Sequence, residues 1–182
     1  MPARAARRLV IDASVGGAAG GKTATAPTST NCRDFLLAVR RGRYRVVMTA
    51  QLRREWDEHK SVFARTWLTA MVTRGDVIFL DIPASNKLRR EIEQAGAMRA
   101  AEVKAMRKDF HLLEAALATE QNVISLDEIV RALFAAAAGQ VVAIKNLVWV
   151  NPDKPEEEAI VWLEKNAKRE RKRMLGFRAK SG

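Results

Sequence analysis

The strongest structural signal in the chain is the run Arg8-Leu9-Val10-Ile11-Asp12-Ala13-Ser14-Val15, an apolar stretch that delivers one carboxylate at its end. Its β-branched residues and its lack of polar alternation are typical of a strand buried on both faces, and hence central in a parallel sheet. In open α/β sheets the ligand crevice lies beyond the carboxyl ends of the strands. We therefore expect Asp12 to lie where such a fold performs its chemistry, although Asp12 or Ser14 could equally serve only to cap a helix.

Strand-like and helix-like segments alternate along the rest of the chain. After the first run, strands are expected at residues 45–48, 77–80, 123–125 and 147–150. Helices are expected at about 30–41, from Thr49 onward, at 61–74, from 85 to 120 with a break at Gly96, at 127–138, and from Pro155 onward. The Gly-rich and Ala-rich stretch 16–30 predicts a flexible loop. This order predicts an α/β domain with a parallel sheet, right-handed crossovers and helices on both faces.

Length and composition predict one domain over 1–152 with a basic helical C-terminal extension over 153–182. The 182 residues are 48% hydrophobic and 29% charged, as in soluble globular proteins. No apolar run is long enough for a membrane span and no signal peptide is visible, so we expect a cytoplasmic protein. The single cysteine, Cys32, excludes an internal disulfide and a cysteine-based zinc site. With only two histidines, any metal is expected to be held mostly by oxygen ligands.

A strong positive charge points to a polyanionic partner. The formal net charge is +11 and the sequence pI is near 10.4, which favours nucleic acid as the partner. Residues 165–182 contain eight Lys and Arg residues against one Glu. A basic tail of this kind can also serve solubility alone.

Four acidic residues stand at positions that the expected fold brings to one edge. Asp12 ends the first strand, Glu55 lies in the helix after the second, and Asp127 follows the fourth. We expect Asp109 to open the apolar helix 109–118, whose N-terminus would then lie over the same sheet edge. Carboxylates that converge without bases between them repel one another unless a cation neutralises them, and Mg²⁺ or Mn²⁺ suits oxygen ligands. The pattern predicts metal-assisted hydrolysis of a phosphodiester.

Four blocks in order resemble the PIN-domain family, which includes toxin ribonucleases of prokaryotic toxin–antitoxin pairs and RNA-processing nucleases. The blocks are Val10-Ile-Asp-Ala-Ser-Val15, Met48-Thr-Ala-Gln-Leu-Arg-Arg-Glu55, Lys108-Asp-Phe-His-Leu-Leu-Glu-Ala-Ala-Leu117 and Val123-Ile-Ser-Leu-Asp-Glu128. The resemblance covers about residues 8–152. It implies a five-stranded parallel sheet in the order 3-2-1-4-5, Mg²⁺ or Mn²⁺ as cofactor, single-stranded RNA as substrate, a homodimer, and an antitoxin as a possible partner.

The resemblance also assigns the site. Asp12, Glu55, Asp109 and Asp127 match the four acids of the family, as metal ligands and catalytic residues. Glu128 could assist or replace Asp127. Ser14 matches a small polar position that orients a metal-bound water. The Gly-rich loop after Val15 and the tail after Pro152 are both longer than in the compact toxins, which leaves open whether the chain is a toxin or a processing nuclease.

Two other functions fit parts of the sequence. Residues 16–23 satisfy the phosphate-binding P-loop pattern and end in Lys22-Thr23, which would make the chain a nucleotide hydrolase. Pro27 argues against a helix that starts at this point, as a P-loop requires. The second alternative is a non-catalytic nucleic-acid-binding module, in which Trp162 and Phe177 could stack on bases. The helical spacing around Trp162 instead favours packing against the domain.

Overall fold

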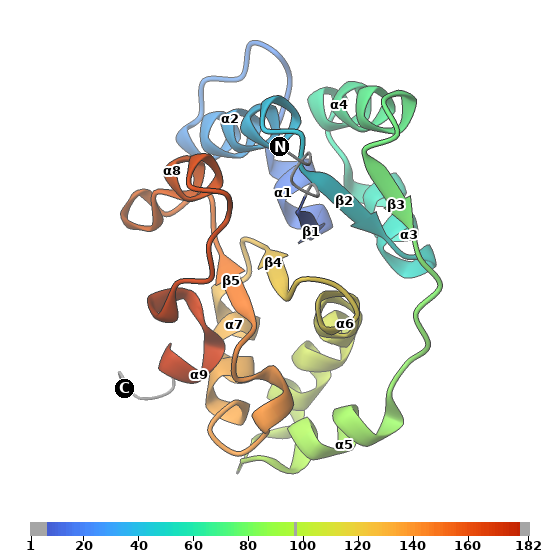
Figure 1. Cartoon of the computed structure of the whole chain (residues 1–182). Coiled ribbons are helices and arrows are strands. Elements are labelled where there is room, and N and C mark those ends of the chain that lie inside the picture. The colour runs from blue at the N-terminus through green and yellow to red at the C-terminus, as the bar shows by residue number, and fades with distance from the viewer. Residues whose placement is uncertain (1–6, 97, 179–182) are drawn as a thin grey trace, which may run out of the picture.

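The computed structural model describes residues 7–96 and 98–178, and its sheet has the predicted architecture. Five parallel strands lie in the order β3-β2-β1-β4-β5, with β1 in the centre (Figure 1). The strands are β1 (Arg8–Ile11), β2 (Arg45–Met48), β3 (Val77–Phe79), β4 (Asn122–Ile124) and β5 (Val148–Val150). The α/β class and the strand order are thus confirmed.

The first apolar run occupies the centre of the sheet because it is buried on both faces. Leu9, Val10 and Ile11 are completely inaccessible to solvent. In the register of the sheet, Ile11 is paired with Ile124, and the next backbone amide, that of Asp12, donates to the Ile124 carbonyl at 2.9 Å. The carboxyl ends of β1 and β4 are therefore level, and residues just beyond them meet.

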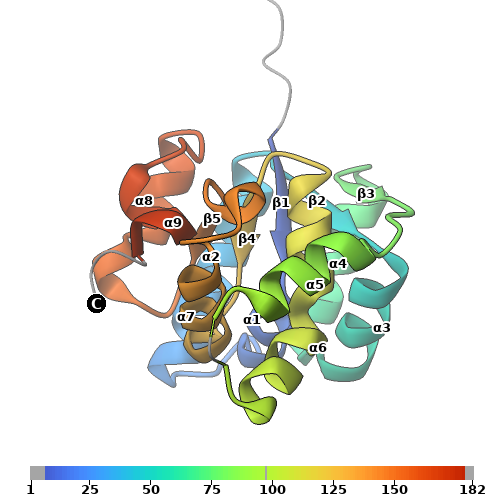
Figure 2. The same ribbon diagram turned by 90° about the horizontal axis from the view of Figure 1, so that it is seen from below.

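Helices cover both faces of the sheet (Figures 1 and 2). On one face, α2 packs against α1, α4 and α8, and α3 packs against α1; on the other, α6 and α7 pack together with α5, and α9 packs on α7. The bounds are α1 (Ala13–Ala18), α2 (Pro27–Arg41), α3 (Ala50–His59), α4 (Val62–Thr73), α5 (Asn86–Gln94), α6 (Ala100–Leu117), α7 (Glu128–Ala137), α8 (Ala159–Glu164) and α9 (Leu175–Arg178). In the described part of the chain, no helix is long and apolar enough to cross the hydrocarbon layer of a membrane.

Two tryptophans anchor the helices of this face: Trp56 joins α3 to β1, and Trp67 joins α4 to α2. The Trp56 indole N–H donates to the Ile11 carbonyl at 2.9 Å, and that of Trp67 donates to the Leu36 carbonyl at 2.6 Å. Their rings stack with centroids 5.9 Å apart. The helix that carries Glu55 is capped as expected, because the Thr49 hydroxyl accepts from the Leu52 amide at 3.2 Å.

The prediction of a flexible loop over residues 16–30 is wrong at both ends, because each end is helical. Gly16 belongs to α1 and contacts the Trp56 ring so closely that an added Cβ would lie 2.8 Å from a ring carbon. Helix α2 begins at Pro27, which suits the first position of a helix because no backbone donor is needed there. Only about residues 19–26 connect the two helices.

Asp109 does not open a helix, contrary to the expectation. Helix α6 already begins at Ala100, after a capping interaction in which the Glu102 carboxylate accepts from the Arg99 backbone amide at 2.8 Å. The residues that precede Asp109 are mostly strong helix formers, so the helix extends nine residues further upstream than the apolar pattern suggested. Asp109 therefore projects from the middle of α6.

The C-terminal segment is not one continuous helix. It forms a short 3₁₀ turn at Pro155–Glu157, α8, a second 3₁₀ turn at Arg171–Arg173, and α9. Glu158 has a φ of 43°, a left-handed conformation that interrupts any helix starting at Pro155. Within the described residues, the acidic residues 156–158 and the basic residues 165–173 therefore do not lie at opposite ends of one helix. The division at residue 152 stays a prediction.

The same segment packs into the domain core. Trp162, Leu163 and Leu175 are buried within the main hydrophobic cluster. An antiparallel bridge joins Val148 to Met174, and the Leu175 amide donates to the Leu147 carbonyl at 2.9 Å. The segment thus covers the outer edge of β5.

Candidate active site

Asp12 is a buried carboxylate held by two hydroxyl groups. The hydroxyls of Ser14 and Ser125 both donate to its Oδ2 atom, the latter at 2.8 Å. Each hydroxyl is itself oriented by accepting a backbone amide at 3.2 Å, from Leu126 and Asp127 respectively. Asp12 makes no capping bond to α1, so its side chain does not serve as the helix cap. Among the described residues, no lysine or arginine forms an ion pair with it.

Asp109 faces Asp12 and the other predicted acids. Burial, followed by the charge of Asp12, raises the pKa of Asp109 to about 7; the charges of Asp127 and Glu55 add to the increase, while His111 opposes it. No hydrogen bond or ion pair to the Asp109 carboxylate is found within residues 7–96 and 98–178. Asp12, Glu55 and Asp127 therefore each lie within electrostatic range of Asp109, and no described lysine or arginine pairs with Asp12 or Asp109.

Glu55 has a partner that the sequence analysis did not assign. Its Oε2 atom lies 2.9 Å from Nε2 of His111, and the Gln51 amide donates to its Oε1 atom at 3.2 Å. The other ring nitrogen of His111, Nδ1, lies 2.9 Å from the Lys108 carbonyl oxygen. Both ring nitrogens thus lie close to oxygen atoms, Nδ1 to a carbonyl and Nε2 to the Glu55 carboxylate. Burial raises the pKa of Glu55, but the hydrogen bonds and charge supplied mainly by His111 lower it further, and the net pKa is below its ordinary value.

Asp127 and Glu128 have different surroundings. The Oδ1 atom of Asp127 accepts from the Val130 amide at 2.8 Å and caps α7, and no described base pairs with its carboxylate. Glu128 is bound by Lys154 and Arg131, each at 2.9 Å. Burial alone would raise its pKa, but these two partners and Asn151 lower it to about 2. Glu128 is therefore committed to structural ion pairs.

The donor set has the chemistry of a hard divalent cation, but not a finished geometry. Carboxylate oxygens suit Mg²⁺ or Mn²⁺, and the mutual repulsion that raises the pKa of Asp109 is the interaction that such an ion would relieve. No three His, Cys, Asp or Glu side chains of the described residues already stand close enough to hold a metal ion. Side-chain rotation would have to complete the ligand set.

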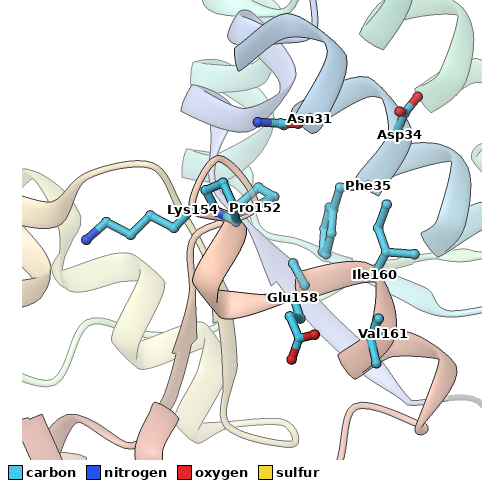
Figure 3. Close-up of a pocket in the computed structure, with 10 residues that line it drawn as sticks. Asn31, Asp34, Phe35, Pro152, Lys154, Glu158, Ile160 and Val161 are labelled. Atoms are coloured by element: carbon cyan, nitrogen blue, oxygen red, sulfur yellow. The ribbon is translucent and has the colours of Figure 1, made fainter. Parts of the chain in front are cut away.

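A polar pocket of about 180 Å³ adjoins the Glu55–His111 pair. It is lined by Thr49, Gln51, Arg54, Asp81, His111 and other residues of α3, α5 and α6. A separate pocket of about 220 Å³ lies between α2 and residues 152–161, where Phe35, Ile160 and Lys154 line it (Figure 3). Neither pocket is lined by any of the four acids; the first is linked to them only through His111, and the second has no such link.

The P-loop pattern does not adopt P-loop geometry. Gly16 and Gly17 are helical residues of α1, and Lys22 and Thr23 lie in a turn. The next helix starts only at Pro27, so its N-terminus does not follow the Lys-Thr pair directly. The structure gives the nucleotide-hydrolase alternative no support.

Sequence reasoning predicted that the four acids share one site, but it did not assign two of their contacts. Ser125 directly follows a buried strand at the same sheet edge as Asp12, and this position was the available signal. The pairing of His111 with Glu55 had none, because it depends on how α3 and α6 cross. Comparison with known proteins gives no match of any kind: no family model, no curated protein and no solved structure is similar to the chain.

Proposed function

We propose that this protein is a Mg²⁺- or Mn²⁺-dependent endoribonuclease of PIN type, which hydrolyses RNA phosphodiester bonds. One observation supports the proposal above the others: Asp12 is buried, the half-buried Asp109 lies close enough to repel it, and no described lysine or arginine pairs with either carboxylate. Buried charges are normally paired or bound to a metal. A stability function offers no reason to keep two such groups together.

The residues have distinct roles in this proposal. Asp12, Asp109 and Asp127 would hold the metal, which when bound supplies activation of the attacking water and stabilisation of the leaving oxygen. Ser14 and Ser125 fix Oδ2 of Asp12 and leave its Oδ1 atom without a described partner. Glu55 would act as a fourth ligand or position the water.

The contact with His111 favours the second of these roles for Glu55, the positioning of the attacking water. Because His111 lies 2.9 Å from Glu55 and lowers its pKa, the carboxylate stays ionised and oriented before any cation enters. A water molecule placed between Glu55 and the substrate phosphate could pass its proton to this carboxylate. Glu55 is thus the best placed of the four acids to orient the nucleophile.

The remaining elements of the proposal come from charge and from the family resemblance. The net charge of +11 supports RNA as the polyanionic substrate. The resemblance supports a homodimer and two possible roles, a toxin with an antitoxin partner or an RNA-processing nuclease.

The test is cleavage of a labelled single-stranded RNA with Mg²⁺, with Mn²⁺ and with excess EDTA. We expect cleavage that EDTA abolishes and that Asp12→Asn reduces at least 100-fold. Asp34→Asn is the matched control, because Asp34 is exposed on α2 and has no role in the site. Equal activity of wild type and Asp12→Asn would refute the site.

A non-catalytic RNA-binding module is the second candidate, and the lack of a ready-made metal geometry favours it. It predicts tight RNA binding without cleavage under any divalent ion. Titration of wild type and Asp12→Asn with Mn²⁺, followed by calorimetry, separates the two functions: a module shows no binding that depends on Asp12.

A further inference from the structure

The amino-terminal edge of the sheet carries a cluster of cations. Two segments supply these cations: residues 40–45, from the end of α2 to the start of β2, and residues 164–169, from the end of α8 onward. They contain seven Lys and Arg residues and one acid, Glu164. Six of these exposed cations form what we call the amino-edge patch: Arg41, Arg43, Arg45, Lys165, Lys168 and Arg169.

Two long-range contacts hold the segments of the patch together. The Tyr44 hydroxyl donates to the Leu163 carbonyl at 2.5 Å, and the Arg7 guanidinium donates to the Ala167 carbonyl at 2.8 Å. The Arg45 amide in turn donates to the Arg7 carbonyl at 3.0 Å. Because these contacts fix the backbone from which the cations project, the patch is a defined surface of the folded domain.

The charges of the patch are not neutralised by the acids around it. Asp76 pairs with Arg74, Glu120 with Arg8, and Glu170 with Arg173 and Lys172. Within the described residues, none of the six patch cations lies in an ion pair. Like charges gathered in this way repel one another, and a polyanion bound across them removes that repulsion.

The patch lies at the opposite end of the strands from the acids. In Figure 2 the amino end of β1 points upward, on the side of α8, and the strand runs down toward α1. Asp12 lies five residue steps beyond Arg7, and at about 3.3 Å per step in a strand this distance is about 17 Å. A phosphate held by the patch is therefore not at the reacting position.

We propose that the amino-edge patch is a second RNA-binding surface, which holds the phosphate backbone outside the carboxylate site. The inference rests on the proposed function only in naming RNA as the polyanion. It predicts that a long RNA contacts both the patch and the acids, whereas a short oligonucleotide can occupy the acid site alone.

The experiment compares two double variants with equal changes of charge. Arg41→Glu/Lys168→Glu reverses one cation in each segment of the patch, and Lys87→Glu/Arg90→Glu reverses two exposed cations on α5. Both lower the formal net charge of +11 by four. Affinity for a labelled oligouridylate of about 20 nucleotides, long enough to exceed a typical single-strand binding site, is measured by fluorescence anisotropy in EDTA, over a series of salt concentrations.

We expect the patch variant to bind about tenfold more weakly at low salt and its slope of log affinity against log salt to flatten by about 1.5, since each lost phosphate contact removes about 0.7. The α5 variant keeps the wild-type slope. Equal slopes for the two variants would overturn the proposal, as would a patch variant that loses binding to anionic lipid vesicles but not to RNA.

Activity separates this inference from the proposed function. The patch variant is expected to cleave a short oligonucleotide at the wild-type rate and a long RNA more slowly at subsaturating concentration. If wild type cleaves no RNA, but the patch variant still loses RNA affinity, the nuclease proposal fails and the binding surface stands.

Discussion

Replacing Asp109 with asparagine should stabilise the metal-free protein at alkaline pH. The folded protein raises the pKa of this carboxyl from 3.8 to about 7, chiefly through burial and the charge of Asp12. The folded state therefore binds a proton more tightly than the unfolded chain, and stability falls as the pH rises from about 4 to about 7. Asparagine keeps the shape of the side chain and carries no charge, so it avoids this loss.

The magnitude follows from the size of the pKa shift. Each pKa unit corresponds to about 1.36 kcal/mol, so the shift of about three units gives about 4 kcal/mol at pH 8 as an upper value. Partial exposure of Asp109 to water reduces the effect, and we expect Asp109→Asn to gain about 1–4 kcal/mol at pH 8. Near pH 4 the gain should disappear, because the carboxyl is then largely protonated in the folded protein and close to half protonated in the unfolded chain.

Urea denaturation of wild type and Asp109→Asn in EDTA, at pH 4.5 and pH 8, measures this gain. A repeat at pH 8 with saturating Mg²⁺ tests the role of the cation: wild type should gain stability and Asp109→Asn should gain much less. An Asp109→Asn variant less stable than wild type at pH 8, or equally changed at both pH values, would refute the electrostatic account of the site.

Three further predictions concern the fold. Gly16→Ala should destabilise the protein by about 1–3 kcal/mol, because its Cβ would lie 2.8 Å from the Trp56 ring, whereas Gly21→Ala, with no atom within 4 Å, should be neutral in the same urea titration. Arg131→Met should cost about 3–5 kcal/mol, since it removes the guanidinium that contacts the buried Glu157 carboxylate most closely and leaves that carboxylate to Arg173, 3.7 Å away; thermal unfolding by circular dichroism measures the loss. Cys32 is buried and its thiol pKa is raised to about 12, so at pH 8 a maleimide should label it only at the rate of unfolding, and labelling as fast as that of a free thiol would contradict its burial.

The strands were predicted well because each is a short buried apolar run, bounded by glycine, proline or polar turn residues. The order of the strands came from the family resemblance and not from the periodicity. Helix boundaries were less predictable. Helix was expected on both sides of a break at Gly96, and α6 lies within that range; the apolar pattern marks only the part of α6 that faces the core, which is why it predicts a helix start at Asp109. Pro27 was interpreted as a breaker, whereas the structure places it at the first helical position.

The C-terminal segment shows the limit of composition as a guide. Its density of Lys and Arg predicted an appendage, and removal of everything after Asp153 would have been the natural test of its charge. The structure places Trp162, Leu163 and Leu175 in the core, so this truncation would remove core packing together with the charges. The helical spacing around Trp162 predicted packing against the domain, but not the partners: α8 packs on α2, more than 100 residues earlier in the chain, and α9 packs on α7.

The candidate site was predictable in its acids but not in its hydrogen bonds. Asp12 and Asp127 follow adjacent parallel strands, and this topology alone brings them together. The Glu55–His111 pair depends on the crossing of two helices, and the neutralisation of Glu128 by Lys154 depends on the path of the C-terminal segment. Neither arrangement has a signature in the spacing of residues.

The bridge from Val148 to Met174 has a consequence for how copies of this protein can associate. An exposed strand border is a template for pairing with another molecule, and two such borders on one sheet permit growth without end. Here the C-terminal segment occupies the border at β5, while β3 forms the other border and exposes Phe79. If two copies pair through β3, the joined sheet has ten strands and cannot grow further, because the C-terminal segment already covers the β5 border of each copy.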